Sequence, residues 1–296
     1  MELRVLNYFL AVAREENFTK AAGQLHITQP TLSRQIAELE DELGVKLFIR
    51  SNHSIILTED GLLLKQRAQE ILSLADKTKR DFIQNEKVLA GTINIGCGEY
   101  RSNEYLAKII AEFRKLYPKV RYEILTGNAA NIRDYIERGF LDMGLISEPI
   151  DMHKYHSIAV PIKEQWGVYV PQDSLLAQKK CAAPQDFIGM RLIAAMGDFN
   201  QGILGKWLAE YKNQVEIIAA VDLPYNKAVL AKENIGLMLS LNLTCSYEGL
   251  TFIPLSPALE HSTALAWKKE QIFSPTTTAF INFAKKYLKS ITNNNI

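Results

Sequence analysis

Polar side chains that can bond to the edges of base pairs gather between Phe18 and Phe48. In the DNA major groove, an arginine can donate to guanine O6 and N7, and a glutamine can pair with adenine N6 and N7. Arg34 and Gln29 are residues of these two types. The hydroxyl groups of Thr31 and Ser33 lie beside them in the sequence. This combination in one short segment predicts a surface that binds DNA.

An amphipathic helix is expected to carry these side chains. Apolar residues recur at spacings of four, three and four, which places them on one stripe of a helix; they are Leu32, Ile36, Leu39 and Leu43. If that stripe is buried, the residues left outward or on its flanks are Gln29, Pro30, Thr31, Ser33 and Arg34. Thr28 fits the N-cap because its hydroxyl can accept a hydrogen bond from a free amide.

A second, shorter helix is expected just before it, from Thr19 to His26, with Ala21, Ala22 and Leu25 facing inward. The small alanine side chains allow two helices to approach closely. Two short helices joined by a tight turn, the second with a polar first turn, form a helix-turn-helix. For this segment alone, the alternative is an ordinary helical hairpin packed in a core.

The flanking segments support a DNA-binding unit. Residues Glu2 to Arg14 predict a supporting helix, and LFIRSNHSIILT predicts two short strands joined by a turn at 51–54, which together form a wing. We expect Lys20, Arg34, Arg50 and His53 to contact DNA phosphates, with the minor groove as a second possible contact of Arg50 and His53. The alternative for the wing is that its arginine is only solvated.

A long helix is expected from Thr58 to about Leu89, because no proline interrupts the chain before Pro118. Apolar residues near an alternating spacing of three and four give this helix a narrow seam: Leu64, Ala68, Ile71, Ala75, Phe82 and Leu89. We favour dimerisation through this seam over packing within its own chain. A dimer would present two DNA-binding heads to two half-sites of an operator.

Composition sets limits on the other classes of protein. The chain has 296 residues, 47% of them hydrophobic and 23% charged, as in globular proteins of two or three domains. The net charge is only +1. The chain therefore lacks the strong basic excess that would have been independent support for DNA binding. No apolar run of membrane-spanning length and no signal-peptide pattern occurs, which predicts a cytoplasmic protein without a membrane partner.

Residue patterns for catalysis or metal binding are missing. Cys97, Cys181 and Cys245 are far apart, and the pair His153 and His156 lacks further ligands nearby. The sequence contains no GxSxG or GxxxxGK[ST] motif. We therefore expect no catalytic residues, no metal site, no cofactor and no enzymatic activity.

From Gly91 onward the pattern changes to alternating strands and helices. TINIG, VRYEIL and LDMGLIS predict strands separated by helices at 104–117 and 131–138, which gives a βαβαβ unit with a parallel sheet. A similar series is expected to start at EQWGVYV and to end with the strand ALAWK, followed by a helix over 275–288. Two such α/β lobes bind ligands in a crevice at the carboxyl ends of their strands.

These residues resemble the LysR-type transcriptional regulators. The resemblance rests on FTKAAGQLHITQPTLSRQIAELEDELGVKLFIR, on LTEDG, and on YPKVRYEILTGNAANIRDYIERGFLDMGLI. It implies an α/β fold class with a winged helix-turn-helix over 1–58, a linker and dimerisation helix over 59–90, and an effector domain over 91–296 similar to periplasmic binding proteins. The chain would cross between lobes near 162–164 and 267–269, so that lobe one contains 91–163 and 268–296 and lobe two contains 164–267.

The same resemblance implies functional residues and partners. The DNA contacts would fall on Gln29, Pro30, Thr31, Ser33 and Arg34, with Arg50 in the wing. The crevice for a small-molecule effector would be lined by Gly98, Glu99, Tyr100, Arg101, Ser102, Thr126, Asn128, Ser147, Gly197, Asp198 and Asn200, within turns that include Gly127 and Met196. Other implied partners are a double-stranded operator, RNA polymerase, and further copies of the chain in a homodimer or homotetramer.

Four residues of the implied crevice bear on its chemistry. Many family members have a small hydroxyl residue where this chain has Tyr100. Arg101 follows directly and can hold an effector carboxylate with two hydrogen bonds, which suggests an anionic effector. Glu99 and Asp198 can instead bind cationic or hydroxylated groups, and Arg101 and Glu99 can also be solvated or paired with each other.

The alternative function is a cytoplasmic solute-binding protein or enzyme whose N-terminal helices serve only in assembly.

Overall fold

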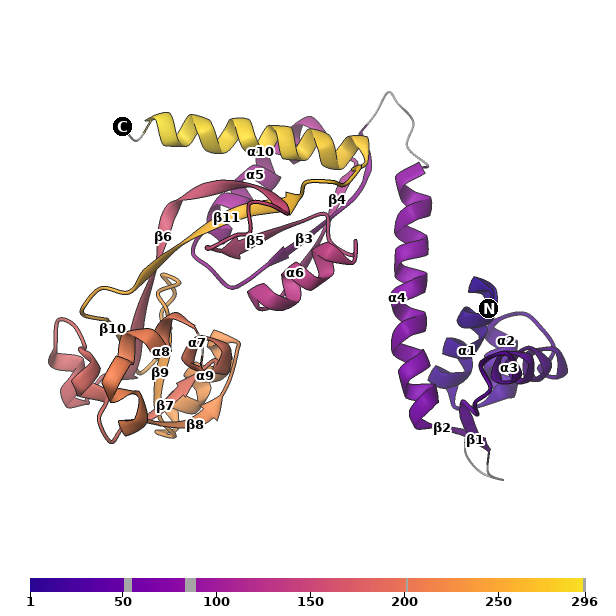
Figure 1. Ribbon diagram of the computed structural model, residues 1–296, viewed down its shortest axis with the longest axis horizontal. Coiled ribbons are helices and arrows are strands. Elements are labelled where there is room, and N and C mark those ends of the chain that lie inside the picture. The colour runs from indigo at the N-terminus through magenta and orange to yellow at the C-terminus, as the bar shows by residue number, and fades with distance from the viewer. Residues whose placement is uncertain (51–54, 83–88, 201, 295–296) are drawn as a thin grey trace. The chain divides into compact units, whose positions relative to one another are not determined.

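The chain forms two compact units, Met1–Gln84 and Asn85–Ile296 (Figure 1). A computed structural model describes residues 1–50, 55–82, 89–200 and 202–294. In that part of the chain, no helix is long and apolar enough to cross a membrane.

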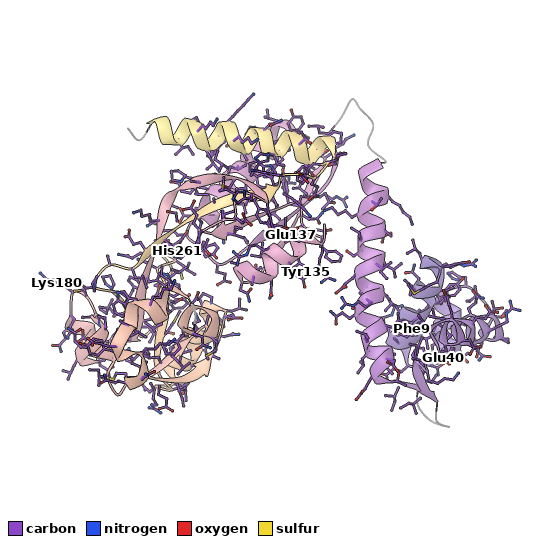
Figure 2. All side chains as sticks on the ribbon, viewed as in Figure 1. Phe9, Glu40, Tyr135, Glu137, Lys180 and His261 are labelled. Atoms are coloured by element: carbon purple, nitrogen blue, oxygen red, sulfur yellow. The ribbon has the colours of Figure 1, made fainter. Side chains whose placement is uncertain are left out.

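The first unit is a small helical bundle with a two-stranded wing. Its elements are α1 (Leu3–Glu15), α2 (Phe18–Gln24), α3 (Gln29–Leu43), β1 (Phe48–Arg50), β2 (Ile55–Leu57) and α4 (Glu59–Phe82). The centre of the core is Phe9 of α1, which is fully buried and packs against the ring of Phe48 with 5.3 Å between ring centroids. Figure 2 labels Phe9 inside this bundle. The predicted helix-turn-helix and the antiparallel wing are therefore both present.

Two expectations for this unit are wrong. Leu43, predicted on the buried stripe of α3, is 40% exposed because it lies in the last turn, next to the helix end at Gly44. In α4, Leu64 and Ala68 are buried in the core of their own unit, and Ile71 packs against it. The first half of the predicted dimerisation seam thus packs within its own chain, because α1 and α4 cover each other.

The far end of the predicted seam also differs from expectation. Leu89 does not lie in a described helix, and it packs against the core of the second unit. The side chain of Phe82 and residues 83–88 lie outside the described part of the chain.

The second unit begins with a lobe built on three parallel strands. Strand β3 (Gly91–Cys97) lies between β4 (Val120–Thr126) and β5 (Met143–Ser147) and is parallel to both. Helices α5 (Asn103–Leu116) and α10 (Pro275–Asn294) share one core with this sheet, and α6 (Ala129–Glu137) shares another. The βαβαβ prediction for this lobe is confirmed.

The second lobe contains β7 (Arg191–Ala194), β8 (Glu216–Ala220), β9 (Leu237–Leu241) and β10 (Leu250–Pro254). Its helices are α7 (Met196–Asn200), α8 (Ile203–Leu208) and α9 (Pro224–Lys232), and short 3₁₀ turns lie at Leu175–Gln178, Pro184–Phe187 and Ala209–Gln214. Strand β7 is parallel to β8 and β9. Sequence analysis missed β7, because its short apolar run was not distinguished from the surrounding loops.

Two long strands join the lobes into one sheet with the order β4-β3-β5-β11-β6-β9-β7-β8, and β10 pairs with β6. They are β6 (Tyr155–Pro171) and β11 (Glu260–Lys268), which run side by side between the lobes in Figure 1. Two predictions fail here. EQWGVYV does not open a second parallel series, because β6 is antiparallel to β9.

The second failed prediction concerns the return of the chain to lobe one. ALAWK belongs to the lobe-one sheet, since Thr263–Ala266 already pair with β5. The chain therefore returns before residue 263, upstream of the expected crossing at 267–269. The physical reason is that a single long strand spans the connection and continues as a strand in lobe one.

Candidate functional site

Helix α3 presents a polar face to solvent. Its stripe of Leu32, Ile36 and Leu39 is at most 2% exposed. On the other side, Gln29, Pro30, Thr31 and Arg34 are exposed and Ser33 is partly buried. The Nε of Arg34 lies 3.7 Å from Oε1 of Glu38, and the two side chains are 72% and 59% exposed. An ion pair so open to solvent is weak, so the guanidinium is available to another acceptor.

Two N-caps fix where the helices of this motif begin. The Oγ1 of Thr28 accepts a hydrogen bond from the N–H of Thr31 at 3.4 Å, as expected for the predicted cap. It also lies 2.8 Å from the hydroxyl of Thr31. At the start of α2, the Oδ1 of Asn17 accepts from the N–H of Lys20 at 3.0 Å, and Lys20 itself is exposed. The caps therefore order the polar first turn without covering it.

Glu40 fixes the beginning of the wing to α3. It is only 4% exposed, and its carboxylate accepts hydrogen bonds from the N–H of Leu47 at 2.9 Å, the N–H of Phe48 at 3.3 Å and the Nζ of Lys46 at 2.9 Å. Burial raises the pKa of this carboxyl, but the three donors outweigh burial and hold the pKa below its ordinary value. Figure 2 labels Glu40.

The role of Glu40 was not predicted from the sequence. A signal was present, because Glu40 follows Ile36 by four residues and so lies on the buried side of the helix.

The predicted wing contacts lie mostly outside the described structure. Arg50 ends β1, but its side chain is not described, and residues 51–54, including His53, lie outside the described residues. The roles of Arg50 and His53 stay predictions.

In the second unit, Glu164 closes the turn that follows β3. This fully buried residue of β6 accepts hydrogen bonds from the N–H groups of Arg101 and Ser102, each at 2.9 Å. Free amides at the start of a helix form a favourable position for an anion, and here an internal carboxylate occupies that position. The side chain of Arg101 is exposed. The backbone amides of this turn are therefore already bonded within the protein, and the role of the Arg101 guanidinium stays a prediction.

Tyr100 fills the space over Gly98 in the same turn. A Cβ placed on Gly98 would lie 2.5 Å from the Tyr100 ring. The Tyr100 hydroxyl is hydrogen-bonded to Ser147, and its ring packs against the cores of both lobes. Burial raises the pKa of Tyr100, and the negative charge of Asp198 in lobe two adds to the shift. Tyr100 in the turn after β3, Ser147 at the end of β5 and Asp198 in α7 therefore come together between the lobes.

The other predicted crevice residues have mixed surroundings. Gly98 and Ser102 are buried, whereas the exposed members are Glu99, Arg101, Thr126, Asn128, Gly197 and Asn200. The Asn128 side chain caps α6 by accepting from the N–H of Asn131 at 2.9 Å. The carbonyl of Asn200 accepts from the Nζ of Lys212 at 2.8 Å. The capping oxygen of Asn128 is thus already used within the protein.

His261, which sequence analysis did not select, lies where β11 passes between the lobes (Figure 2). Its Nδ1 accepts a hydrogen bond from the Nε1 of Trp166 at 3.1 Å. Since an indole N–H only donates, Nδ1 is unprotonated and the neutral ring carries its proton on Nε2. Burial lowers the pKa of His261, and the charge of Glu164 opposes this shift. The ring also packs edge-on against Tyr100, at 6.0 Å between centroids.

Within the described ranges, no group of three or more His, Cys, Asp or Glu side chains is placed to hold a metal ion. The cysteines are free thiols; Cys97 is buried, and Cys181 and Cys245 are exposed.

Comparison with known proteins identifies the family. Residues 3–62 match the model of the bacterial regulatory helix-turn-helix proteins of the lysR family, and residues 86–289 match the LysR substrate binding domain. The Hca operon transcriptional activator HcaR of Escherichia coli is 28% identical over 305 residues, which cover 99% of this chain and 100% of that protein. The transcriptional activator IlvY of Haemophilus influenzae is 34% identical over 168 residues, covering 55% of this chain and 58% of IlvY.

A solved structure supports the fold. The crystal structure of full-length CbnR complexed with its target DNA matches with a TM-score of 0.74 at 19% identity, over 97% of this chain and 100% of that one. Together with the helix-turn-helix and the two α/β lobes, the two family matches show that this chain belongs to the LysR family of transcriptional regulators and is not an enzyme.

Proposed function

We propose that this regulator reads an operator with the polar face of α3 and responds to a small molecule held between the lobes of its second unit. The observation that carries the proposal is the contrast between the two sides of α3, one almost fully buried and the other polar and exposed. Gln29, Pro30, Thr31, Ser33 and Arg34 are the proposed base-edge residues. Lys20, Arg50 and His53 are the proposed phosphate contacts.

The proposed division of labour follows the chain. Residues 1–58 bind DNA, residues 59–90 link and dimerise, and residues 91–296 bind the effector. Within the last part, lobe two runs from about 164 to 259 rather than to 267, since β11 begins at Glu260 and pairs with the lobe-one strand β5.

Dimerisation is proposed through α4, on a face different from the predicted seam. Leu63 and Leu74 are 56% and 40% exposed, and their spacing places them on one side of the helix. Two copies joined there would match two half-sites of a palindromic operator, and pairs of dimers would form a tetramer. The proposed setting is the cytoplasm, with RNA polymerase as the protein that responds to the bound regulator.

The effector would act by stabilising one arrangement of the two lobes. Only a difference in affinity between two arrangements can shift their populations. The contacts of Tyr100 with both lobe cores support this region as the coupling point. The alternative, in which the N-terminal helices serve only in assembly, conflicts with the match of residues 3–62 to a DNA-binding family model.

A mobility-shift and footprinting experiment tests the proposal. Full-length protein is titrated onto DNA from upstream of its own and neighbouring genes, with unrelated DNA of equal length as the control. We expect a protected, roughly palindromic site whose pattern changes with cell extract filtered to small molecules. Equal binding to both DNAs would contradict operator recognition. A footprint that no small-molecule fraction alters would contradict control by an effector.

A further inference from the structure

Lys227 is a buried cation that sequence analysis did not select. It lies on α9 in lobe two and is 3% exposed. Among the described residues, its Nζ makes one hydrogen bond, a long one of 3.4 Å to the carbonyl oxygen of Leu239. An ammonium group has three protons to donate. Most of the donor capacity of this buried charge is therefore unused.

Three carboxylates lie near enough to this ammonium to act on it electrostatically. Asp198 of α7, Asp222 before α9 and Glu99 of the lobe-one turn all act on Lys227 electrostatically. In the described part of the chain, none of them forms an ion pair with Lys227 within 4.0 Å. Because Glu99 belongs to the other lobe, the ammonium of Lys227 lies close to the region between the lobes.

Asp198 carries the opposite charge to Lys227 and is also partly removed from solvent. It is partly buried, and no donor among the described residues bonds to its carboxylate. Burial raises the pKa of Asp198, and burial lowers the pKa of Lys227. For both groups, the cost of removing the charge from water therefore exceeds the stabilisation by nearby opposite charges. Lys227 is thus buried and Asp198 partly buried, and the two opposite charges are not joined to each other.

Such an arrangement of charges is unfavourable by itself. Buried charges normally pair closely or bind a ligand, because desolvation is costly. A molecule with an acceptor for Lys227 and a donor for Asp198 would satisfy both groups at once. A strained or unsatisfied feature of this kind typically marks a functional site.

We propose that Lys227 and Asp198 bind the two ends of a zwitterionic effector, the carboxylate of the ligand on Lys227 and its ammonium group on Asp198 and Glu99. This proposal rests on the proposed function, because it assumes that the effector binds between the lobes. The ligand class is compounds that carry a primary ammonium and a carboxylate, such as α-amino acids.

Simple anions and simple cations fit the site less well. An anion would meet three carboxylates and one ammonium, and the helix amides that could have held it are bonded to Glu164. A cation would give the buried Lys227 no acceptor beyond the carbonyl oxygen of Leu239 and would repel it. A zwitterion avoids both penalties, which is why the charge pattern selects it.

The first test is a binding screen on the full-length protein. The melting temperature is measured with each of the twenty proteinogenic amino acids. Each one that stabilises is then compared with its deaminated carboxylic acid and its decarboxylated amine. We expect at least one amino acid to raise the melting temperature and to bind at least tenfold more tightly than either counterpart in calorimetry. The proposal is overturned if no amino acid binds, or if the deaminated acid binds equally well.

The second test compares the melting temperature of a variant first without and then with the amino acid. Lys227→Met removes the buried charge and keeps an unbranched side chain of similar length. If Lys227 is kept for ligand binding, the variant melts at the same temperature as the wild type or a few degrees higher, yet loses the amino-acid response. A melting temperature several degrees lower would show instead that Lys227 supports the fold, and this result would contradict the proposal.

Two further variants complete the design. Lys232→Met, on the same helix, removes a lysine that is 42% exposed and pairs with Glu248 at 3.1 Å, and it should keep the ligand response. Asp198→Asn should lose the ligand response.

If a deaminated acid binds and changes the DNA footprint, effector control stands and the zwitterion assignment fails. If an amino acid binds through Lys227 but the footprint is unchanged, the binding assignment stands and effector control fails.

Discussion

The carboxylate of Glu164 accepts a 2.9 Å hydrogen bond from the backbone N–H of Ser102. This bond ties the long strand β6, which crosses between the lobes, to the first turn of a lobe-one helix. Both residues are fully buried. The crossing strand is thus fixed to the start of α5 by a buried hydrogen bond.

Replacing Glu164 by glutamine should destabilise the second unit. The side chain keeps its shape, but its NH2 group then faces one of the two backbone N–H groups, and a charge-assisted bond is lost. We expect a loss of about 1.5–3 kcal/mol in urea unfolding. Glu260→Gln is the control, since Glu260 is exposed and lies 3.9 Å from Lys163, and it should change stability by less than about 0.5 kcal/mol. Equal effects of the two variants would contradict this role of Glu164.

Glu40 should make the stability of the first unit depend on acid pH. Its folded-state pKa lies below the ordinary value, so its contribution is present above the unfolded-state pKa and is lost as the pH falls through the folded-state pKa. The melting temperature of the wild type should therefore fall more steeply than that of Glu40→Gln below about pH 5. Asp41→Asn, at an exposed neighbouring position, should keep the wild-type slope. Parallel curves for wild type and Glu40→Gln would refute the prediction.

Gly61 should not tolerate a side chain, in contrast to Gly23. A Cβ on Gly61 would lie 2.2 Å from the carbonyl oxygen of Leu47, so the backbone must shift, at a cost of about 1–3 kcal/mol. Nothing lies within 4 Å of a Cβ on Gly23 in α2, and alanine there should stabilise by about 0.5–1 kcal/mol. Chemical denaturation of both variants checks the opposite signs. A neutral Gly61→Ala would show that α4 does not need this close approach.

The helical unit could be predicted in detail because its signals are local. The spacing of Leu32, Ile36 and Leu39 and the cap at Thr28 depend on residues within a few turns, and the structure has them as expected. The predicted burial of Leu43 was wrong because the spacing of apolar residues does not show at which turn of the helix the buried stripe ends. The partners of α4 also could not be predicted, since an apolar seam fits α1 of its own chain as well as a second copy.

The links between the lobes were harder to predict because they depend on long-range pairing. ALAWK reads equally well as a strand of either lobe, and only its pairing with β5 decides. The role of Glu164 depends on a partner 62 residues away in the sequence. Lys227 could not be found either, since a lysine on a short helix usually lies at the surface and its burial results from the packing of α9 against β9.

The central claim is that α3 reads base edges through Arg34, and the most direct test is the affinity and base preference of Arg34→Ala. Full-length protein is titrated by fluorescence anisotropy onto the footprinted operator and onto single-base variants of it. Lys20→Ala is the comparison, because a lost phosphate contact should weaken binding to all sequences alike and reduce the salt slope by about 1.

For Arg34→Ala, we expect the operator affinity to fall by about 10- to 100-fold, corresponding to about 1–3 kcal/mol, and the preference at one base pair to disappear. An Arg34→Ala protein that binds the operator with wild-type affinity and unchanged base preference would contradict the account.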